Sequence, residues 1–435
     1  MVKNLLVNLD CAYSRDLLLR VLRDPESTYH NLYNIYTRDD VVNYHKSTNP
    51  EEEFNYEESV AKFIKEKNIE IQWDEYENVP WDTVMSQIEN PLRCNYYCIR
   101  KGLIRKAQFG SILNRYVTKK LSKNEKTHLK KAIPETHIYE LDDVEYFDES
   151  LYDIYEVVQS LENNEKIEQE GDRNGIATWI LKPSLTNKGA EIFIFNSLEQ
   201  LQNYFTTNFE QQEDNDDEDE ESNVLDLRQL REWVIQKYVD RPLLLCGGRK
   251  FHMRVYVLAV GALKVYVYDQ ILALFALRPF KKENISDTFS HITNTCVQVK
   301  ESDFKESESV KLFWNLANED STISTSQLEH IFQQVKDVTG EMFDAVSGEL
   351  AFMPLPHCFE LFGLDFLVDE DLQVYLLEVN AGPDFKQTGK ELDSVIYNLF
   401  NQTANLVLDG GNKIETNNGR GTLHQVLDKT TFRGF

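Results

Sequence analysis

Two short apolar runs near the C-terminal end constrain the fold of this chain most strongly. Leu364–Val368 and Val374–Val379 are separated by five residues, four of them polar. This pattern predicts a β-hairpin. Asp365 lies inside the first run, whereas Glu378 and Asn380 lie at the end of the second. A carboxylate inside an apolar strand is costly unless it is paired or holds a metal ion, so we expect this hairpin to carry chemistry.

The three polar residues of the hairpin can converge. Glu378 and Asn380 are two residues apart, so their side chains leave the same face of a strand, and Asp365 lies on the neighbouring strand. Three oxygen ligands on rigid strands suit Mg²⁺ that is shared with substrate phosphates. An edge hairpin with solvated polar residues would explain any one of the three, but not all three inside such apolar runs. The sequence therefore predicts a magnesium site.

Length and composition indicate a globular protein. The chain of 435 residues is long enough for two or three domains. We expect no signal peptide, because the first residues lack a long apolar stretch. We also expect no membrane span, because the longest candidate, Val255–Leu277, is interrupted by Lys264 and Asp269. The six scattered cysteines predict reduced, buried thiols in a cytoplasmic protein.

Charge is strongly negative and unevenly distributed. The net charge of −27 argues against direct RNA binding by the surface as a whole. Arg100–Lys131 nevertheless contains eleven Lys or Arg residues and one acid, Glu125. It is compatible with a helix that docks an acidic protein tail or is simply solvated. The acidic run Glu210–Glu221 predicts a solvated, disordered loop, with an internal decoy for the basic segment as the alternative.

The order of short strands and helices predicts an α+β or α/β protein with more than one unit. We expect a small α/β domain at 1–141, a central lobe at 142–240 with an acidic insert at 210–221, a C-terminal lobe at 241–408, and a loosely ordered tail at 409–435. Three strands of the C-terminal lobe are predicted to form a meander: Phe251–Val260, Leu263–Tyr268 and Ile271–Leu277.

Polar residues at strand ends in the middle of the chain predict contacts to a nucleotide. Lys182 ends an apolar strand, and Lys188-Gly189 follows in a loop before the next strand. Such a flap can fold over phosphates with its N–H and ammonium groups, although Lys-Gly is also common in solvated turns. Gln236–Tyr238 ends another apolar strand, whose backbone can offer donors and acceptors to an adenine edge.

Cations also gather in the predicted C-terminal lobe. Lys250, His252 and Arg254 occupy one face of an apolar strand at period two. This indicates an anionic ligand, with the solvated outer face of a sheet as the alternative. Arg278, at the end of a later strand, favours the ligand. Together with the hairpin, these residues describe a Mg²⁺–nucleotide site between two β-rich lobes, without the sequence motifs of a P-loop or a protein kinase.

Several short segments of the chain form a distinctive combination. They are Trp179–Lys182, Lys188-Gly189, Gln236–Tyr238, Arg249–Arg254, His291–Asn294, Gly363–Phe366 and Glu378–Asn380, with weaker signals at Asn95–Tyr97, Arg105-Lys106 and Ile133–Glu135. Together these segments resemble those of the ATP-grasp fold and specifically of the tubulin–tyrosine ligase-like family, over residues 90–400.

The resemblance extends to fungal, processing-body-associated members of the family, in which a SurE-like phosphatase domain precedes the ligase-like portion. If the chain shares that arrangement, Met1 is not the start of the whole protein.

The resemblance implies a ligase that activates a carboxylate with ATP as an acyl-phosphate, which an amino acid's amine then attacks. It also implies the site residues: Lys106, Lys182, Lys188 and Gly189 at the phosphates, Gln236, Lys237 and Tyr238 at the adenine, Lys250 and His252 near the nucleotide, Arg254 and Arg278 at the transferring group, Asn294 on the substrate side, and Asp365, Glu378 and Asn380 at Mg²⁺.

Two residues depart from the family pattern. His252 stands where the family usually has Asp, and Glu191 stands where it has a glycine. These changes leave a second hypothesis open: a degenerate domain that acts as a nucleotide-binding or protein-interaction module with RNA-decay granule proteins. Retained ATP binding without product would distinguish the two. An ATP-grasp ligase for small molecules is a third reading, which the His291–Asn294 and Arg249–Arg254 strings disfavour.

Overall fold

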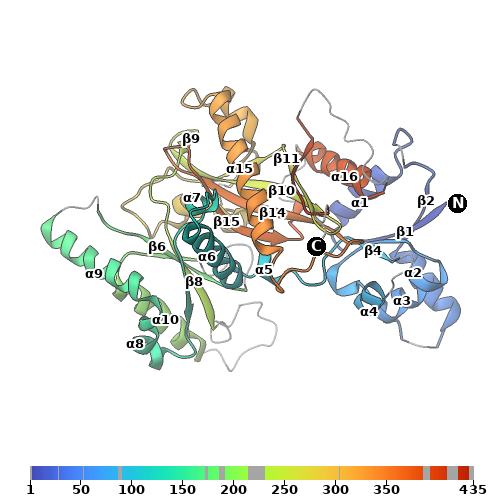
Figure 1. Cartoon of the computed structure of the whole chain (residues 1–435), viewed down its shortest axis with the longest axis horizontal. Helices are drawn as coiled ribbons and strands as arrows, with labels where there is room; N and C mark the ends of the chain where they lie inside the picture. The colour runs from blue at the N-terminus through green and yellow to red at the C-terminus, as the bar shows by residue number, and fades with distance from the viewer. Residues whose placement is uncertain are drawn as a thin grey trace.

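The computed structural model shows sheets and helices in three successive regions. At the N-terminal end, four parallel strands pair in the order β2-β1-β3-β4 with helices on the sheet. Figure 1 shows this region at one end of the long axis. Its elements are β1 Lys3–Asn8, α1 Ala12–Leu22, β2 Tyr33–Thr37, α2 Arg38–Thr48, α3 Tyr56–Glu66, β3 Ile71–Asp74, the short 3₁₀ turn Tyr76–Asn78, α4 Trp81–Ser86 and β4 Arg93–Cys94. The structure describes residues 2–27, 29–51, 53–86, 91–171, 175–185, 192–213, 231–302, 304–385, 392–408 and 420–430.

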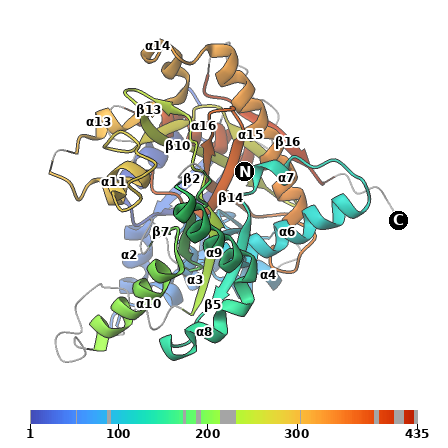
Figure 2. The same ribbon diagram turned by 90° about the vertical axis from the view of Figure 1, so that its left-hand side faces the viewer.

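The second region is a four-stranded antiparallel sheet in the order β5-β8-β6-β7. Helices α8 to α10 lie at this end of the molecule, and Figure 2 shows them facing the viewer. Its elements are β5 Thr136–Glu140, the 3₁₀ turn Val144–Tyr146, α8 Phe147–Ser150, the 3₁₀ turn Leu151–Ile154, α9 Tyr155–Glu170, β6 Trp179–Pro183, β7 Phe193–Phe195, α10 Leu198–Glu213 and β8 Glu232–Lys237.

The third region is built on an eight-stranded sheet that lies between the other two (Figure 1). Its central strands β10 and β14 are buried along almost their whole length, as expected for strands covered on both faces. The strands are β9 Leu244–Leu245, β10 Arg249–Val260, β11 Lys264–Tyr268, β12 Leu272–Phe275, β13 Val310–Leu312, β14 Phe359–Val368, β15 Val374–Ala381 and β16 Leu423–Asp428.

Two long helices flank this sheet. α15 begins with a capping box between Ser324 and Gln327, which satisfies N–H groups that have no partner within the helix. α16 packs beside α1 of the first region, where Tyr29 donates to Asn401 over 2.7 Å. The helices of this region are α5 Lys101–Ile104, α6 Lys106–Ser122, α7 Leu129–Ala132, α11 Thr288–His291, α12 Thr295–Gln298, α13 Glu306–Ser309, α14 Leu316–Glu319, preceded by the 3₁₀ turn Phe313–Asn315, α15 Thr325–Val346 and α16 Asp393–Leu408.

The predicted meander is wrong. β11 and β12 both pair with β10 on the same edge, and they do not pair with each other. The chain does not reverse at Asp269, because this buried carboxylate accepts hydrogen bonds from the N–H groups of Gly421 and Thr422. Strands β11 and β12 therefore run in the same direction along successive parts of β10, and Asp269 lies at the interruption between them rather than at a turn.

The ends of the predicted units also need correction. The predicted boundary at residue 141 assigns β5 and α6 to the N-terminal domain. Strand β5 instead pairs with β8 of the second sheet, and helix α6 packs between β5 and α15. The predicted loose tail contributes β16, which pairs with β11 at the edge of the large sheet. The acidic run lies mostly outside the described residues.

The prediction that the thiols are buried is confirmed for Cys94 and Cys358. Cys11 is exposed, and the other three cysteines are half-buried. Within the described residues, no helix is long and apolar enough to cross a membrane.

Candidate active site

The β14–β15 hairpin exists as predicted, and it brings its three polar residues together. Asp365 lies opposite Glu378 in the ladder, beside a bulge that follows Asp365. The Asn380 side-chain amide donates to Asp365 Oδ2 and to Glu378 Oε1, both over 3.3 Å. Nowhere in the described parts of the chain do three or more His, Cys, Asp or Glu side chains form a metal-binding group. The cluster of Asp365, Glu378 and Asn380 instead combines two carboxylates with one carboxamide.

Strand β10 supplies the cation that faces this cluster. Arg254 pairs with Asp365 in the β10–β14 register, and its Nε and Nη2 donate to the two carboxylate oxygens over 2.6 and 3.1 Å. Lys106 Nζ, at the start of α6, lies 3.4 Å from Glu378 Oε2. Burial raises the pKa of Glu378, but the charges of Lys106, Lys182 and Arg254 outweigh it and lower this pKa to about 2. Glu378 is therefore ionised at every physiological pH.

Two further lysines are buried beside the cluster without a carboxylate of their own. Lys182 Nζ donates to Gln236 Oε1 over 2.8 Å, and Lys250 Nζ donates to the Tyr238 hydroxyl and the His291 carbonyl over 2.8 and 2.9 Å. Burial lowers the pKa of Lys182 to about 8 and that of Lys250 to about 7. Buried ammonium groups with only neutral partners favour an anionic ligand.

His252 has a ring nitrogen without a partner. Its Nδ1 lies 2.6 Å from Thr293 Oγ1, whereas its buried Nε2 has no hydrogen-bond partner and lies 3.8 Å from Asp365 Oδ1. Burial is the main cause that lowers the pKa of His252. Because Lys250 and His252 are only 7% and 3% exposed, the solvated-face alternative for this strand is wrong.

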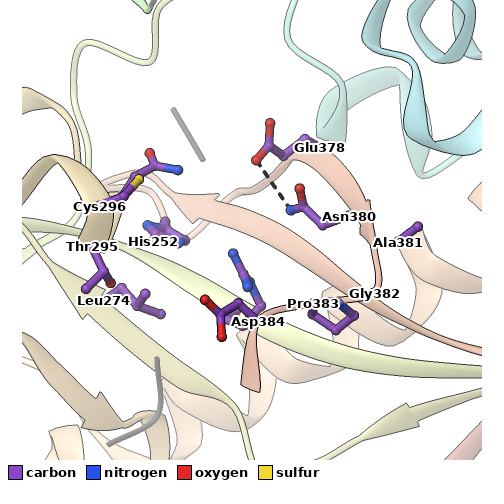
Figure 3. Close-up of a pocket in the computed structure, with 12 residues that line it drawn as sticks. His252, Leu274, Thr295, Cys296, Glu378, Asn380, Ala381, Gly382, Pro383 and Asp384 are labelled. Carbon is purple, nitrogen blue, oxygen red and sulfur yellow. Dashed lines mark hydrogen bonds between the residues drawn. The ribbon is translucent and has the colours of Figure 1, made fainter. Parts of the chain in front are cut away.

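Two small cavities meet at the cluster, and His252, Asn294 and Glu378 line both. The lysine cavity, of about 60 Å³, also contains Lys182 and Lys250 on its lining. The loop cavity, of about 90 Å³, is closed by the residues that follow β15. Figure 3 shows Glu378 and Asn380 on one side of the loop cavity and His252, Thr295 and Cys296 on the other. Asn294, predicted on the substrate side, thus lies at the junction of the two cavities.

The structure does not bring every predicted residue to the cluster. Arg278 is 48% exposed in its side chain and binds Asp287 and Glu301 over 3.1 and 2.6 Å. The side chain of Lys237 lies over the Trp179 ring, 4.5 Å from its centre, on the face of β8 opposite Gln236.

The backbone of Gln236–Tyr238, the segment predicted to contact adenine, is partly occupied by hydrogen bonds within the protein. The N–H groups of Lys237 and Tyr238 already donate to the carbonyls of Glu135 and Thr178, so these two backbone donors are used within the sheet. Lys188, Gly189 and Glu191 lie outside the described residues.

Sequence reasoning missed the segment that follows the hairpin. Gly382, Pro383 and Asp384 line the loop cavity with Thr295 and Cys296. The signal was present, because a Gly-Pro pair one residue after Asn380 predicts a tight turn next to the predicted metal ligands. Gly382 has a φ of 56°, a conformation that glycine adopts without strain.

Comparison with known proteins identifies the family. Residues 106–414 match the family described as the tubulin-tyrosine ligase family. The chain belongs to this family. It is 39% identical over 349 residues to a probable tubulin–tyrosine ligase of Schizosaccharomyces pombe, covering 77% of the chain and 81% of that relative. It is 36% identical over 363 residues to the probable tubulin–tyrosine ligase PBY1 of Saccharomyces cerevisiae, covering 78% of the chain but only 46% of that relative.

A solved structure confirms the fold. The C-terminal domain of K. lactis Pby1, described as an ATP-grasp enzyme interacting with the mRNA decapping enzyme Dcp2, superposes with a TM-score of 0.63 at 29% identity and covers 98% of this chain and 99% of that one. Other family relatives carry a different activity in their names, such as a probable alpha-tubulin polyglutamylase of Tetrahymena thermophila, 30% identical over 51% of the chain and 52% of that relative. The predicted ATP-grasp fold is therefore confirmed.

Proposed function

We propose that this protein is an ATP- and Mg²⁺-dependent ligase that joins an amino acid to a protein carboxylate through an acyl-phosphate. One observation carries the proposal. The ammonium groups of Lys182 and Lys250 are buried next to the Asp365–Glu378–Asn380 cluster, and within the described residues no carboxylate lies within 4 Å of either. Phosphates would supply the missing negative charge, and their binding would restore the ordinary pKa of both lysines.

The residues present fit Mg²⁺. Asp365, Glu378 and Asn380 offer carboxylate and carboxamide oxygens, which is the donor chemistry that Mg²⁺ takes when phosphates complete its coordination. When bound, the ion would neutralise charge that develops on the transferring phosphoryl group. The two carboxylates of the cluster are now balanced by Arg254 and Lys106, cations that would face the phosphates in the loaded enzyme.

The chain's residues would act by alignment and charge stabilisation. Lys106, Lys182 and Lys250 would hold the phosphates, and Arg254 would face the phosphoryl group as it moves. An oxygen of the acceptor carboxylate would bond to the γ-phosphorus while the bond to ADP breaks. The amine would then attack the acyl carbon, losing a proton as inorganic phosphate leaves. Asn294, on both cavities, would contact the substrates.

The acceptor is proposed to be an acidic protein tail, such as that of tubulin. The basic segment forms α5 to α7, and Lys119, Lys123, Lys126 and Lys130 are exposed on it. Their charge complements acidic peptides, whose encounter they would accelerate. Relatives are named for modification of tubulin, which supports this choice.

A second candidate function has its own support. The structural neighbour is described as interacting with the mRNA decapping enzyme Dcp2, so the domain would serve as a nucleotide-binding or docking module with RNA-decay granule proteins. A cytoplasmic location, including processing bodies, is proposed on the same ground. The bidentate ion pair between Arg254 and Asp365 also favours the docking module, because Mg²⁺ would have to compete with this ion pair.

The test combines binding and turnover. Calorimetry with ATP and Mg²⁺, followed by incorporation of labelled amino acids into acidic peptides, should show binding and a covalent product, with ADP and phosphate released together. Binding without product from any amino acid would favour the docking module. Absence of ATP binding would overturn the ligase.

A further inference from the structure

A chain of hydrogen bonds starts at Lys250 and runs away from the lysine cavity. The Lys250 ammonium donates to the Tyr238 hydroxyl over 2.8 Å, and this hydroxyl lies 2.7 Å from His291 Nδ1. The other ring nitrogen, Nε2, lies 3.1 Å from the Lys281 carbonyl. The side chains of Lys250, Tyr238 and His291 are buried. They come from three separate segments, namely β10, the residue after β8, and the end of α11.

The far end of this chain fixes the direction of every hydrogen bond in it. A carbonyl oxygen only accepts, so His291 Nε2 carries the proton that is donated to Lys281. In a neutral imidazole the other nitrogen, Nδ1, then has a lone pair and must accept. The single hydroxyl proton of Tyr238 is therefore donated to His291, which leaves the Tyr238 oxygen as an acceptor for Lys250. Hydrogen bonds aligned in this way polarise and strengthen one another.

The surroundings keep the His291 ring neutral. Burial is the main cause that lowers the pKa of His291, and the charge of Lys250 lowers it further. The carbonyls of Lys281 and Asn284 and the carboxylate of Asp287 oppose this shift without reversing it. A protonated ring would place a donor at Nδ1 against the neighbouring hydroxyl, whose own proton would then lose its acceptor. The chain of hydrogen bonds therefore requires the neutral ring.

The same directions determine what Lys250 presents to the lysine cavity. Besides its bond to carbon, the Lys250 nitrogen has three positions, each filled by a proton in the ammonium form. Two of these protons are donated to the Tyr238 hydroxyl and the His291 carbonyl, and both partners can only accept. Among the described residues Lys250 has no third partner. Its remaining position is left for a ligand in the lysine cavity, which Lys250 lines, and only there can it gain or lose a proton without breaking the chain.

We propose that His291 is a positioning residue for the nucleotide phosphates. Through the Tyr238 hydroxyl it holds the protons of Lys250 in fixed directions and leaves the one that titrates for a phosphate oxygen. An anion that enters the cavity is then met by an N–H of fixed direction rather than by a freely rotating ammonium group. The identity of the anion rests on the ligase function proposed above, whereas the direction of the hydrogen bonds rests on the structure alone.

Two substitutions at one position separate this role from ordinary packing. Asparagine Oδ1 takes the place of histidine Nδ1 and can accept from Tyr238, whereas the glutamine amide takes the place of Nε2 and keeps only the bond to Lys281. We expect His291→Asn to bind ATP with Mg²⁺ within about threefold of the parent protein. His291→Gln and Tyr238→Phe should each bind about tenfold more weakly, and their combination should be no weaker than Tyr238→Phe alone. Calorimetry measures each affinity, with His330→Gln, at an exposed histidine of α15, as the unchanged control.

The tautomer of His291 can be measured without any ligand. The nitrogen NMR signals of this side chain, assigned as those that His291→Gln lacks, should show a neutral ring with its proton on Nε2 at pH 7. A proton on Nδ1, or a charged ring at this pH, would overturn the proposal. If His291→Gln does not fold, as its melting curve would show, the signals are assigned by their shift in Tyr238→Phe, whose ATP affinity then decides.

The outcomes separate this proposal from the ligase itself. Weaker ATP binding in His291→Gln than in His291→Asn, with the proton on Nε2, would support both. ATP binding that the two variants weaken equally, or that His291→Gln leaves unchanged, would overturn the positioning role and leave the ligase standing. Binding of inorganic tripolyphosphate but not of ATP, with the same ranking of variants, would support the positioning role and overturn the ligase. Binding of neither would overturn both.

Discussion

The lysine cavity and the larger cavity of about 400 Å³ between the N-terminal sheet, β14 and α16 lie along the same face of β14 and differ in the charge of their linings. The first has buried ammonium groups, Lys182 and Lys250, whose partners are neutral. The second has Glu75, Asp384 and several aromatic rings in its lining, to which no Lys, Arg or His contributes among the described residues. The buried ammonium groups of the first are costly in the free protein, and an anionic ligand would relieve that cost. The comparison shows that one chain can hold cations and carboxylates in separate cavities along one strand.

The most decisive test of this comparison removes a carboxylate from the cluster beside the lysine cavity. We expect Glu378→Gln to lower Mg²⁺-dependent ATP affinity by about 100-fold or more, because the variant loses a proposed metal ligand and the ion pair between Lys106 and Glu378. Calorimetry over a range of Mg²⁺ concentrations measures this. Glu370→Gln, at the exposed turn of the same hairpin, is the control and should match the parent protein. Equal ATP binding in both variants would contradict the metal assignment.

Lys250→Met sharpens the comparison by separating binding from stability. ATP affinity should fall about 10- to 100-fold, since a charged hydrogen-bond donor is lost. The melting temperature at pH 7 should rise. The folded-state pKa of Lys250 is about 7, below its ordinary value of 10.5. Charging this lysine therefore costs folding free energy at and below pH 7, and stability increases as pH rises from 7 towards 10.5.

A control for that experiment is Lys300→Met, at an exposed residue, where neither affinity nor melting temperature should change. A lower melting temperature for Lys250→Met would contradict the idea that the lysine is held at a cost to stability.

The pH dependence of ATP binding gives a smaller effect. The pKa of Lys250 is about 7 and that of Lys182 about 8, so both lose protons as pH rises from 7 to 9. We expect ATP affinity to fall about tenfold over this range and binding to take up protons. Calorimetry in buffers of different ionisation enthalpy measures the uptake. Uptake that is unchanged in Lys250→Met would show that this lysine does not contact the phosphates.

The smallest effects should come from two cations that the sequence associated with the site but the structure places elsewhere. Arg278 binds Asp287 and Glu301 near the surface, and Lys237 covers Trp179. We expect Arg278→Ala and Lys237→Met to change turnover by less than about threefold, the scale of exposed ion pairs. A loss like that of Glu378→Gln in either variant would mean that the loaded enzyme moves that side chain into the site.

Local patterns predicted the hairpin and much of its chemistry. Asp365, Glu378 and Asn380 converge because strand pairing and alternation are properties of neighbouring residues. Lys250, His252 and Arg254 share a face of β10 for the same reason. Neither the meander nor the position of β5 could be read in this way. Asp269 looks like a turn residue until the backbone of Gly421 reaches it from 152 residues away.

The sequence by itself determined which residue types stand at which strand positions, and hence the family, the ATP-grasp fold and the oxygen cluster of the hairpin. Only the tertiary structure decided which cations remain without carboxylates, which of them leave the site, and that Trp73 and Phe400 meet in a pocket beside the cluster. The physical reason is that burial and charge pairing depend on contacts between distant segments. Those contacts arise when the separate sheets and helices pack together, and no local period in the chain encodes them.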